Sequence, residues 1–126
     1  MATKALVVSA LQQNYPKPIG GGLKLWIGTM KGPTLYANGG VRVNVGRGFG
    51  GLRFIHSIIC HGAVDSGGTA RYIVNPTFDF LATKPIDIQA TTPALLLSFT
   101  NTLNGAEAGA VDLSTFQFRV EIKGTL

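Results

Sequence analysis

The sequence predicts an all-β fold: an antiparallel β-sandwich, jelly-roll-like, with about eight to ten short strands and little or no helix. Short runs alternate apolar and polar residues with a period of two, which is typical of strands with one buried face. Turn-forming residues separate these runs, and glycine makes up 17 of the 126 residues. No stretch has the periodicity of an amphipathic helix, and residues 106–113 have room for one helical turn at most.

The clearest predicted strand covers residues 116–124. Apolar and polar side chains alternate along it, so it has one dry face and one face open to solvent. Phe118 is central on the dry face, and burying a charge there would unfold the protein. The apolar residues are Phe116, Phe118, Val120 and Ile122, and the polar residues are Gln117, Arg119, Glu121 and Lys123.

Similar but shorter patterns predict the other strands. In residues 23–29, Leu23, Leu25 and Ile27 alternate with Lys24 and Trp26. The remaining predicted strands cover residues 4–11, 41–45, 52–60, 71–74, 77–81, 86–88 and 95–99. Turns are predicted between them at Asn38-Gly39-Gly40, at Asp65-Ser66-Gly67-Gly68 and at Asn75-Pro76.

The chain is predicted to have one domain, residues 23–126, preceded by an N-terminal arm or extended segment, residues 1–22. From Gln12 to Gly22, Pro16, Pro18 and the run Gly20-Gly21-Gly22 prevent a regular element. The apolar residues near the start are nevertheless unsuited to water, so we expect the arm to order on assembly. It would do so by adding a strand to the sheet edge of a neighbouring subunit.

The composition is apolar and poor in charge. Hydrophobic residues make up 45% of the chain and charged residues 13%, which is about half the usual charged share. Such a surface suits a protein that packs against neighbours. Cys60 is the single cysteine, so no intrachain disulfide can form. The start of the chain has too broken an apolar run for a signal peptide, and we expect synthesis in the cytoplasm.

Charge is divided unevenly along the chain. Residues 1–60 carry seven cations and no acid, whereas residues 61–126 carry four cations and six acids. This asymmetry predicts a basic surface that meets an acidic partner. Alternatively, the strands interleave in space and the asymmetry disappears. The candidate partner contacts are the seven cations and one aromatic residue, namely Lys4, Lys17, Lys24, Trp26, Lys31, Arg42, Arg47 and Arg53.

No catalytic, cofactor-binding or metal-binding constellation is predicted, and the chain is not expected to be an enzyme. His56 and Cys60 point to one face of a strand and His61 to the other, so a tetrahedral metal site would lack converging ligands. His61, Asp65 and Ser66 lie around a single turn, whereas a catalytic triad is assembled from distant segments. The glycine-rich run at residues 46–51 lacks the Lys-Ser/Thr ending of a phosphate-binding loop.

Two segments of the chain resemble a known family. Tyr36-Ala37-Asn38-Gly39-Gly40 leads into the strand at residues 41–45, and residues 107–114 lead into the closing strand. This layout resembles the small β-sandwich proteins encoded among the head genes of tailed bacteriophages. The resemblance covers residues 34–126. Asn38 stands where the family pattern has threonine, and Ala110-Val111 stands where it has one threonine.

The resemblance implies a capsid cement, or decoration, protein on the exterior of the virion. Such a protein self-associates, with a homotrimer favoured, and stabilises the phage head by bridging major capsid proteins. It implies no enzyme activity, cofactor, membrane or small-molecule substrate, and nucleic acid is an unlikely partner. Two alternatives remain open. A carbohydrate-binding β-sandwich module would use Trp26 and Tyr72, and a nucleic-acid-binding β-barrel would need Lys24, Trp26, Arg42, Arg53 and Phe54 on neighbouring strands.

Overall fold

The computed structural model describes residues 8–10, 17–36, 38–43, 48–78, 85–89 and 95–126, and these contain ten strands and no helix. No helix in these ranges could span a membrane. The early strands are β1 (Val8–Ala10), β2 (Lys17–Gly20), β3 (Leu23–Lys31), β4 (Val41–Arg42) and β5 (Phe54–Cys60). The later strands are β6 (Ala63–Val64), β7 (Ala70–Phe78), β8 (Ile86–Asp87), β9 (Leu95–Asn101) and β10 (Gln117–Thr125).

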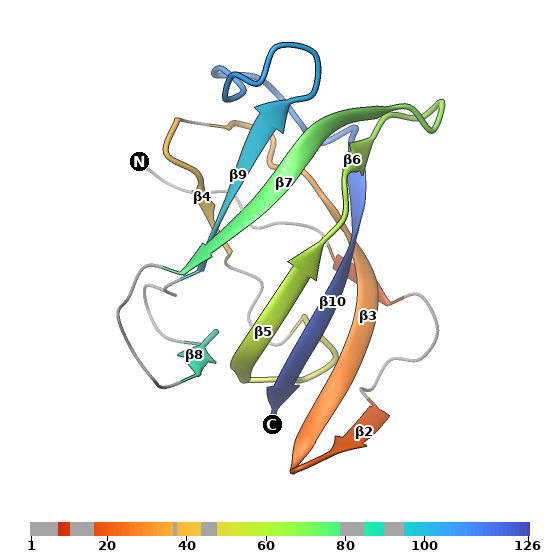
Figure 1. Ribbon diagram of the computed structural model, residues 1–126, viewed down its shortest axis with the longest axis vertical. Helices are drawn as coiled ribbons and strands as arrows, with labels where there is room; N and C mark the ends of the chain where they lie inside the picture. Colours follow the sequence, from red (N-terminus) through yellow and green to blue (C-terminus); the bar gives the residue numbers. More distant parts are fainter. Residues whose placement is uncertain (1–7, 11–16, 37, 44–47, 79–84, 90–94) are drawn as a thin grey trace.

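All strand pairs are antiparallel and belong to one sheet. β10 pairs with β3 on one side and with β5 and then β6 on the other, and the sheet continues through β7 and β9 to β4. β1 and β2 lie beside β3, and β8 lies beside β5 (Figure 1). The predicted all-β antiparallel fold of short strands is therefore confirmed. Jelly-roll connectivity stays a prediction, because the pairings connect all strands into one sheet.

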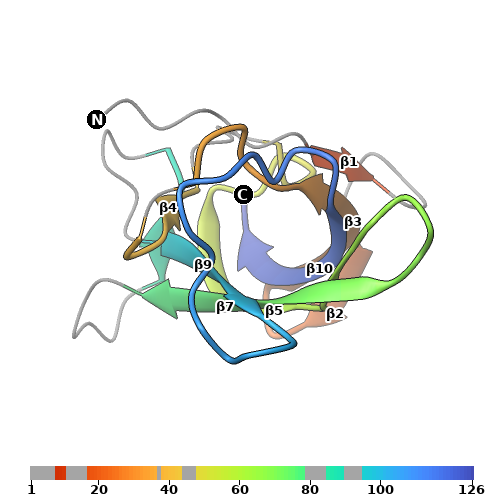
Figure 2. The same cartoon turned by 90° about the horizontal axis from the view of Figure 1, so that it is seen from above.

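The sheet curls around its own interior. Viewed from above, β4 and β9 lie on one side of the molecule and β3 and β10 on the other (Figure 2). β9 and β10 are not neighbours in the sheet, yet the rings of Phe99 and Phe118 lie 5.7 Å apart, edge to face. The inward residues of the strands form one hydrophobic cluster. The two regions of the sheet thus cover one another as the layers of a sandwich would.

The predicted faces of β10 are confirmed. Phe118, Val120 and Ile122 are at most 2% exposed, and Gln117, Arg119 and Lys123 are exposed. β10 lies between two neighbours along most of its length, so its inward side chains pack from both sides. Its period of two is correspondingly clean.

On β3, Trp26 faces the core. A contact between Trp26 and a partner would require it to face solvent. Trp26 and Met30 are buried, whereas Leu25 and Ile27 are only half-buried on the outward side. The indole ring packs against Phe49, with ring centroids 5.5 Å apart. The larger apolar area of tryptophan explains the choice, because its burial removes more surface from water than that of leucine.

β7 runs through a predicted turn. Asn75-Pro76 lies inside the strand, with Pro76 opposite Leu97 of β9, so the predicted turn is wrong. β7 pairs with β6 only as far as Tyr72, and no other described strand pairs with its far edge beyond that residue. Proline is tolerated at such an edge because its missing N–H interrupts no strand pairing there.

The described parts of the N-terminal segment pair with β3 of the same chain. β2 is a strand within residues 12–22, so the prediction that this stretch holds no regular element is wrong. Ser9 of β1 lies opposite Thr29, and Lys17 of β2 lies opposite Leu25. Gly20, Gly21 and Gly22 all have positive φ and form the tight turn from β2 to β3. The prediction that residues 1–22 order only on assembly, and their separation from a domain at residues 23–126, stay predictions.

Candidate functional site

The outward side of β2, β3, β10 and β5 brings together charges from distant parts of the chain. Directly paired residues in adjacent strands point to the same side of a sheet. Lys17, Leu25 and Lys123 therefore form one row, and Lys31 lies beside Gln117 in another. We call this surface the basic face; it consists of Lys17, Leu25, Ile27, Thr29, Lys31, Ile59, Gln117, Arg119, Glu121 and Lys123.

Positive charge dominates the basic face. Its four cations are Lys17, Lys31, Arg119 and Lys123, and its single acid is Glu121. Within the described ranges none of these cations forms a salt bridge, whereas Glu121 Oε2 lies 3.0 Å from His61 Nε2. The nearest acid is thus engaged by a histidine, and the cationic groups are available to solvent or to a partner.

An aliphatic strip crosses the same face. Ile27, Glu121 and Ile59 lie opposite one another on three adjacent strands, and Leu25 lies two residues before Ile27. Ile59 is 50% exposed. The strip gives a partner apolar area to bury beside the cations, which a purely charged surface would lack.

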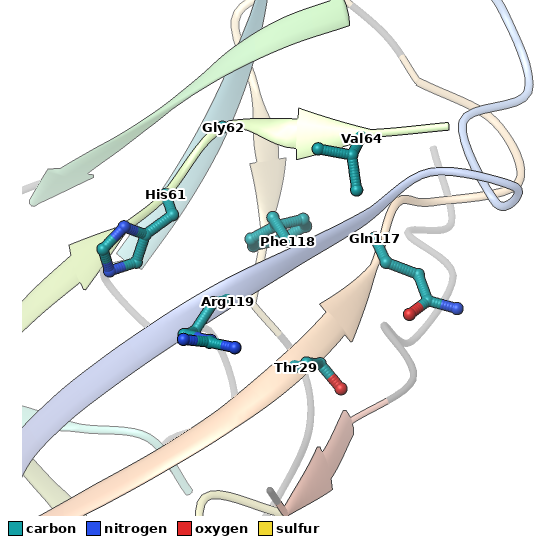
Figure 3. Close-up of a pocket in the computed structure, with 7 residues that line it drawn as sticks. All are labelled: Thr29, His61, Gly62, Val64, Gln117, Phe118 and Arg119. Atoms are coloured by element: carbon teal, nitrogen blue, oxygen red, sulfur yellow. The ribbon is translucent and has the colours of Figure 1, made fainter. Parts of the chain in front are cut away.

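A hollow of about 320 Å³ lies on the basic face where β5 ends and β6 begins. Arg119 and Gln117 extend from β10 toward the side where Thr29 lies on β3, and His61 and Val64 lie across β10 from them (Figure 3). The backbone N–H of His61 donates to the Arg119 carbonyl at 2.9 Å and keeps the chain beside β10. Gly62 and Phe118 complete the lining of the hollow.

The structure disperses the cations predicted as partner contacts. Lys17 and Lys31 lie on the basic face, and Lys24 is half-buried in the row that contains Gly124. Arg42 lies on β4, at the other end of the sheet.

Arg53 is paired with an acid. It donates from Nε and Nη2 to the two carboxylate oxygens of Asp87, at 3.1 and 3.0 Å. This bidentate pair raises the pKa of Arg53. Lys4 and Arg47 lie outside the described residues.

Trp26 lies in the core rather than on the basic face, with 2% of its side chain exposed. Its contact with a partner stays a prediction. Sequence reasoning also left Arg119 and Lys123 out of the contact set. Their alternation with Phe118 and Val120 placed them on a solvent face, but only the register of β10 against β3 places them beside Lys17 and Lys31.

The outward side of β7 and β9 has a different character. It is formed by Ile73, Asn75, Thr77, Leu96, Ser98 and Thr100, which we call the hydroxyl face. A shallow hollow of about 290 Å³ lies on it, lined in part by Thr77, Ser98, Thr100 and Glu107. Arg71 stands at one end of β7 and pairs with Asp65 at 3.1 Å. The turn around Asp65 and this pair lower the pKa of the carboxyl group.

The two segments that carry the family resemblance pack against each other. The Tyr36 hydroxyl donates to Glu107 Oε2 at 2.5 Å and accepts the Phe99 backbone N–H at 3.1 Å. The backbone N–H of Gly39 donates to the same carboxylate oxygen at 2.7 Å. Burial, reinforced by Glu107, raises the pKa of Tyr36 to about 12. We call this the Tyr36–Glu107 junction, and its residues hold loops together across the end of the sheet.

The residues considered for catalysis serve other contacts. The Asp65 carboxylate accepts hydrogen bonds from Gly67 and Thr69 in its own turn, while His61 contacts Glu121. Burial raises the pKa of the Cys60 thiol to about 12, so it stays protonated at neutral pH. Among the described residues no three His, Cys, Asp or Glu side chains lie together as metal ligands would.

The fold and this surface define an all-β antiparallel protein with one basic sheet face. Compared with protein-family models, with curated proteins and with solved structures, the chain has no match.

Proposed function

We propose that the protein is a capsid cement protein, as its resemblance to small phage-head proteins implies. It self-associates as a homotrimer on the outside of the virion and bridges neighbouring major capsid proteins. A protein that binds only the assembled lattice stabilises that lattice by mass action. No catalysis is required for this role, only a surface that fits the shell.

The basic face is the observation that carries the proposal. Four cations surround an aliphatic strip, so the face combines charge for steering with apolar area for affinity. Exposed ion pairs are worth only about 0–1 kcal/mol each. Leu25, Ile27 and Ile59 must therefore supply much of the binding free energy, and the cations orient the protein on an acidic shell.

The exposed aromatic residues required by the two alternative functions are missing from the described surface. Among the described aromatic side chains, Phe54, Tyr72 and Phe116 are half-buried and the others are buried, and Arg53 lies over the Phe54 ring. Trp26 is in the core, and Tyr72 packs edge to face on Phe116, with centroids 5.1 Å apart. Phe49, in the glycine-rich run, is fully buried. Sugar rings and unpaired bases would need exposed aromatic faces, so a protein partner is the better fit.

The test is binding to undecorated capsids of the phage that encodes the chain. The full chain is mixed with capsids and sedimented over a salt series from about 50 to about 500 mM, because salt screens steering charges. We expect saturable binding that weakens with salt and that Lys123→Glu weakens further. Arg71→Glu is the control with the same charge change away from the basic face. Absence of the protein from purified virions, or binding to no capsid at any salt, would overturn the proposal.

Oligomeric state is tested separately by analytical ultracentrifugation of the full chain. We expect a trimer at micromolar concentration, since cyclic symmetry would present all copies of the basic face to the shell in one direction. A monomer that remains monomeric on the capsid would contradict the proposed bridging by a trimer.

A further inference from the structure

We propose that the hollow on the basic face binds a carboxylate side chain of an acidic protein segment. The segment would lie across β3 and β10 and place one aspartate or glutamate beside Arg119. This inference rests on the proposed function, because it names the group on the partner that the basic face recognises.

Arg119 provides the main donor. A guanidinium carries five N–H groups in a planar fork that matches the two oxygens of a carboxylate. Arg119 is exposed, and in the described part of the chain it has no salt bridge. Glu121 is on the same face, but its Oε2 contacts His61. The acid closest in sequence is thereby directed to the histidine, and the Arg119 fork remains open to a ligand.

Neutral groups around Arg119 suit the same ligand. Gln117 contributes a side-chain amide and Thr29 a hydroxyl to the lining, and both lie on the β3 side of β10 (Figure 3). Val64, which lies opposite Gln117, makes part of the wall apolar, and this strengthens a charge-assisted hydrogen bond relative to one in open water. The volume of about 320 Å³ is near the lower end for ligand pockets, so the hollow admits a side chain more readily than a larger ligand.

The surroundings favour a protein segment over a nucleic acid. A phosphate would also pair with Arg119, but a nucleic acid would need aromatic side chains for its bases, and none described is exposed. The aliphatic strip of Leu25, Ile27 and Ile59 lies within two residue rows of the hollow. A segment with an acidic residue at one position and an apolar residue two positions further on would fill both features at once, since alternate side chains of an extended peptide point to the same side.

The experiment is a titration of the isotope-labelled full chain with a hexaglutamate peptide at low salt, followed by the amide NMR signals. We expect saturable shifts at Thr29, His61, Gln117 and Arg119. Arg119→Gln should weaken binding of the peptide by at least about threefold, because the bidentate ion pair is lost. The control, Arg71→Gln, removes the same charge from the hydroxyl face and should leave affinity within about twofold.

Three outcomes would overturn the inference. Shifts of equal size with hexaglutamine would show that charge is not recognised, and equal affinity in Arg119→Gln would show that the hollow is not the site. Tighter binding of an oligothymidylate at the same residues would make the surface a nucleic-acid site. Capsid binding separates the two proposals. If the Arg119→Gln variant binds capsids normally, only the proposal that the hollow binds a carboxylate is refuted. If the wild-type protein binds the peptide but no capsid, only the proposed cement role is refuted.

Discussion

The basic face and the hydroxyl face belong to the same curled sheet, and their inward sides meet in one core. Outward, they differ. The basic face has four cations and one acid, whereas the outward residues of the hydroxyl face between its ends are uncharged. Charge at its margins is engaged: Arg71 pairs with Asp65, and Glu107 binds Tyr36 and Gly39. One surface is thus cationic and the other is neutral between its ends.

The contrast between the two faces shows that strand register creates the basic face. The N-terminal half of the sequence carries the excess of cations, yet of its described cations only Lys17 and Lys31 lie on the face. Arg119 and Lys123 come from the acidic half, and antiparallel pairing of β10 with β3 places them there. Among the described residues, pairing of strands from the two halves therefore brings cations of both halves onto one face.

The largest expected effect comes from breaking the core that both faces share. Phe118→Asp places a carboxylate where 2% of the side chain is exposed and where the Phe99 ring packs. Burial of an unpaired charge costs several kcal/mol, about the total stability of a small domain. We expect loss of cooperative unfolding in circular dichroism melts. Gln117→Asp, one residue away and exposed, should melt cooperatively. A folded Phe118→Asp protein would mean that this core does not hold the two faces together.

A smaller loss of stability is expected from mutation of the Tyr36–Glu107 junction, which borders the hydroxyl face. Tyr36→Phe removes the acceptor for the buried Phe99 N–H and the donor to Glu107. An unsatisfied buried group costs about 1–3 kcal/mol. Urea denaturation should show this decrease in the free energy of unfolding. The decrease should be smaller for Glu107→Gln, because the amide oxygen of glutamine can still accept hydrogen bonds from Tyr36 and Gly39. Equal stability of Tyr36→Phe and wild type would show that the junction does not contribute.

Alkaline pH tests one buried and one partly buried group without a mutation: Tyr36 of the junction and Cys60 of β5. The Tyr36 pKa is raised from 10.0 to about 12 in the folded protein, and the Cys60 pKa is raised from 9.0 to about 12. A raised folded-state pKa gives stability that is complete below the unfolded pKa and is lost as pH rises to the folded value. Melting temperature should therefore fall from about pH 9 to about pH 12. Tyr36→Phe combined with Cys60→Ala should flatten this fall, and an equally steep fall in the double variant would refute the assignment.

The smallest expected effect is a change in stability when one acid is added to each face, and it compares the two faces directly. Gln117→Glu adds an acid opposite Lys31 on the basic face, and Asn75→Asp adds one opposite Ser98 on the hydroxyl face. Cross-strand pairs of opposite charge contribute about 0.2–1 kcal/mol. We expect Gln117→Glu to raise the free energy of unfolding by a few tenths of a kcal/mol at low salt, and Asn75→Asp not to raise it. The same gain in both variants would mean that the faces do not differ in local potential.

Sequence reasoning recovered what depends on neighbouring residues in the chain. Alternation around Phe118, Val120 and Ile122 predicted the buried side of β10 and the all-β class. It failed at Pro76, because tolerance of proline depends on whether a neighbouring strand pairs there. It also placed Trp26 on the surface, because alternation alone does not say which of two half-apolar sides faces inward.

The candidate site was less accessible to sequence reasoning. Arg119 and Lys31 are far apart in the chain and meet only through the register of β10 against β3. The hollow also depends on a second long-range arrangement. The connection from β5 to β6, at His61 and Gly62, must lie beside β10. Tyr36 and Glu107 were singled out as parts of turn motifs, and nothing local in the sequence indicates that their side chains bind each other.

The central position of β10 has a consequence for biosynthesis. β10 comes after its three neighbours β3, β5 and β6 in the chain, yet it is the strand that pairs with all of them. While the ribosome is still extending the chain, β3 and β5 leave open edges that can pair with other nascent chains. The basic face also does not exist before β10 emerges, since Arg119 and Lys123 arrive with it. The proposed recognition of an acidic partner would therefore have to wait until β10 has joined the sheet.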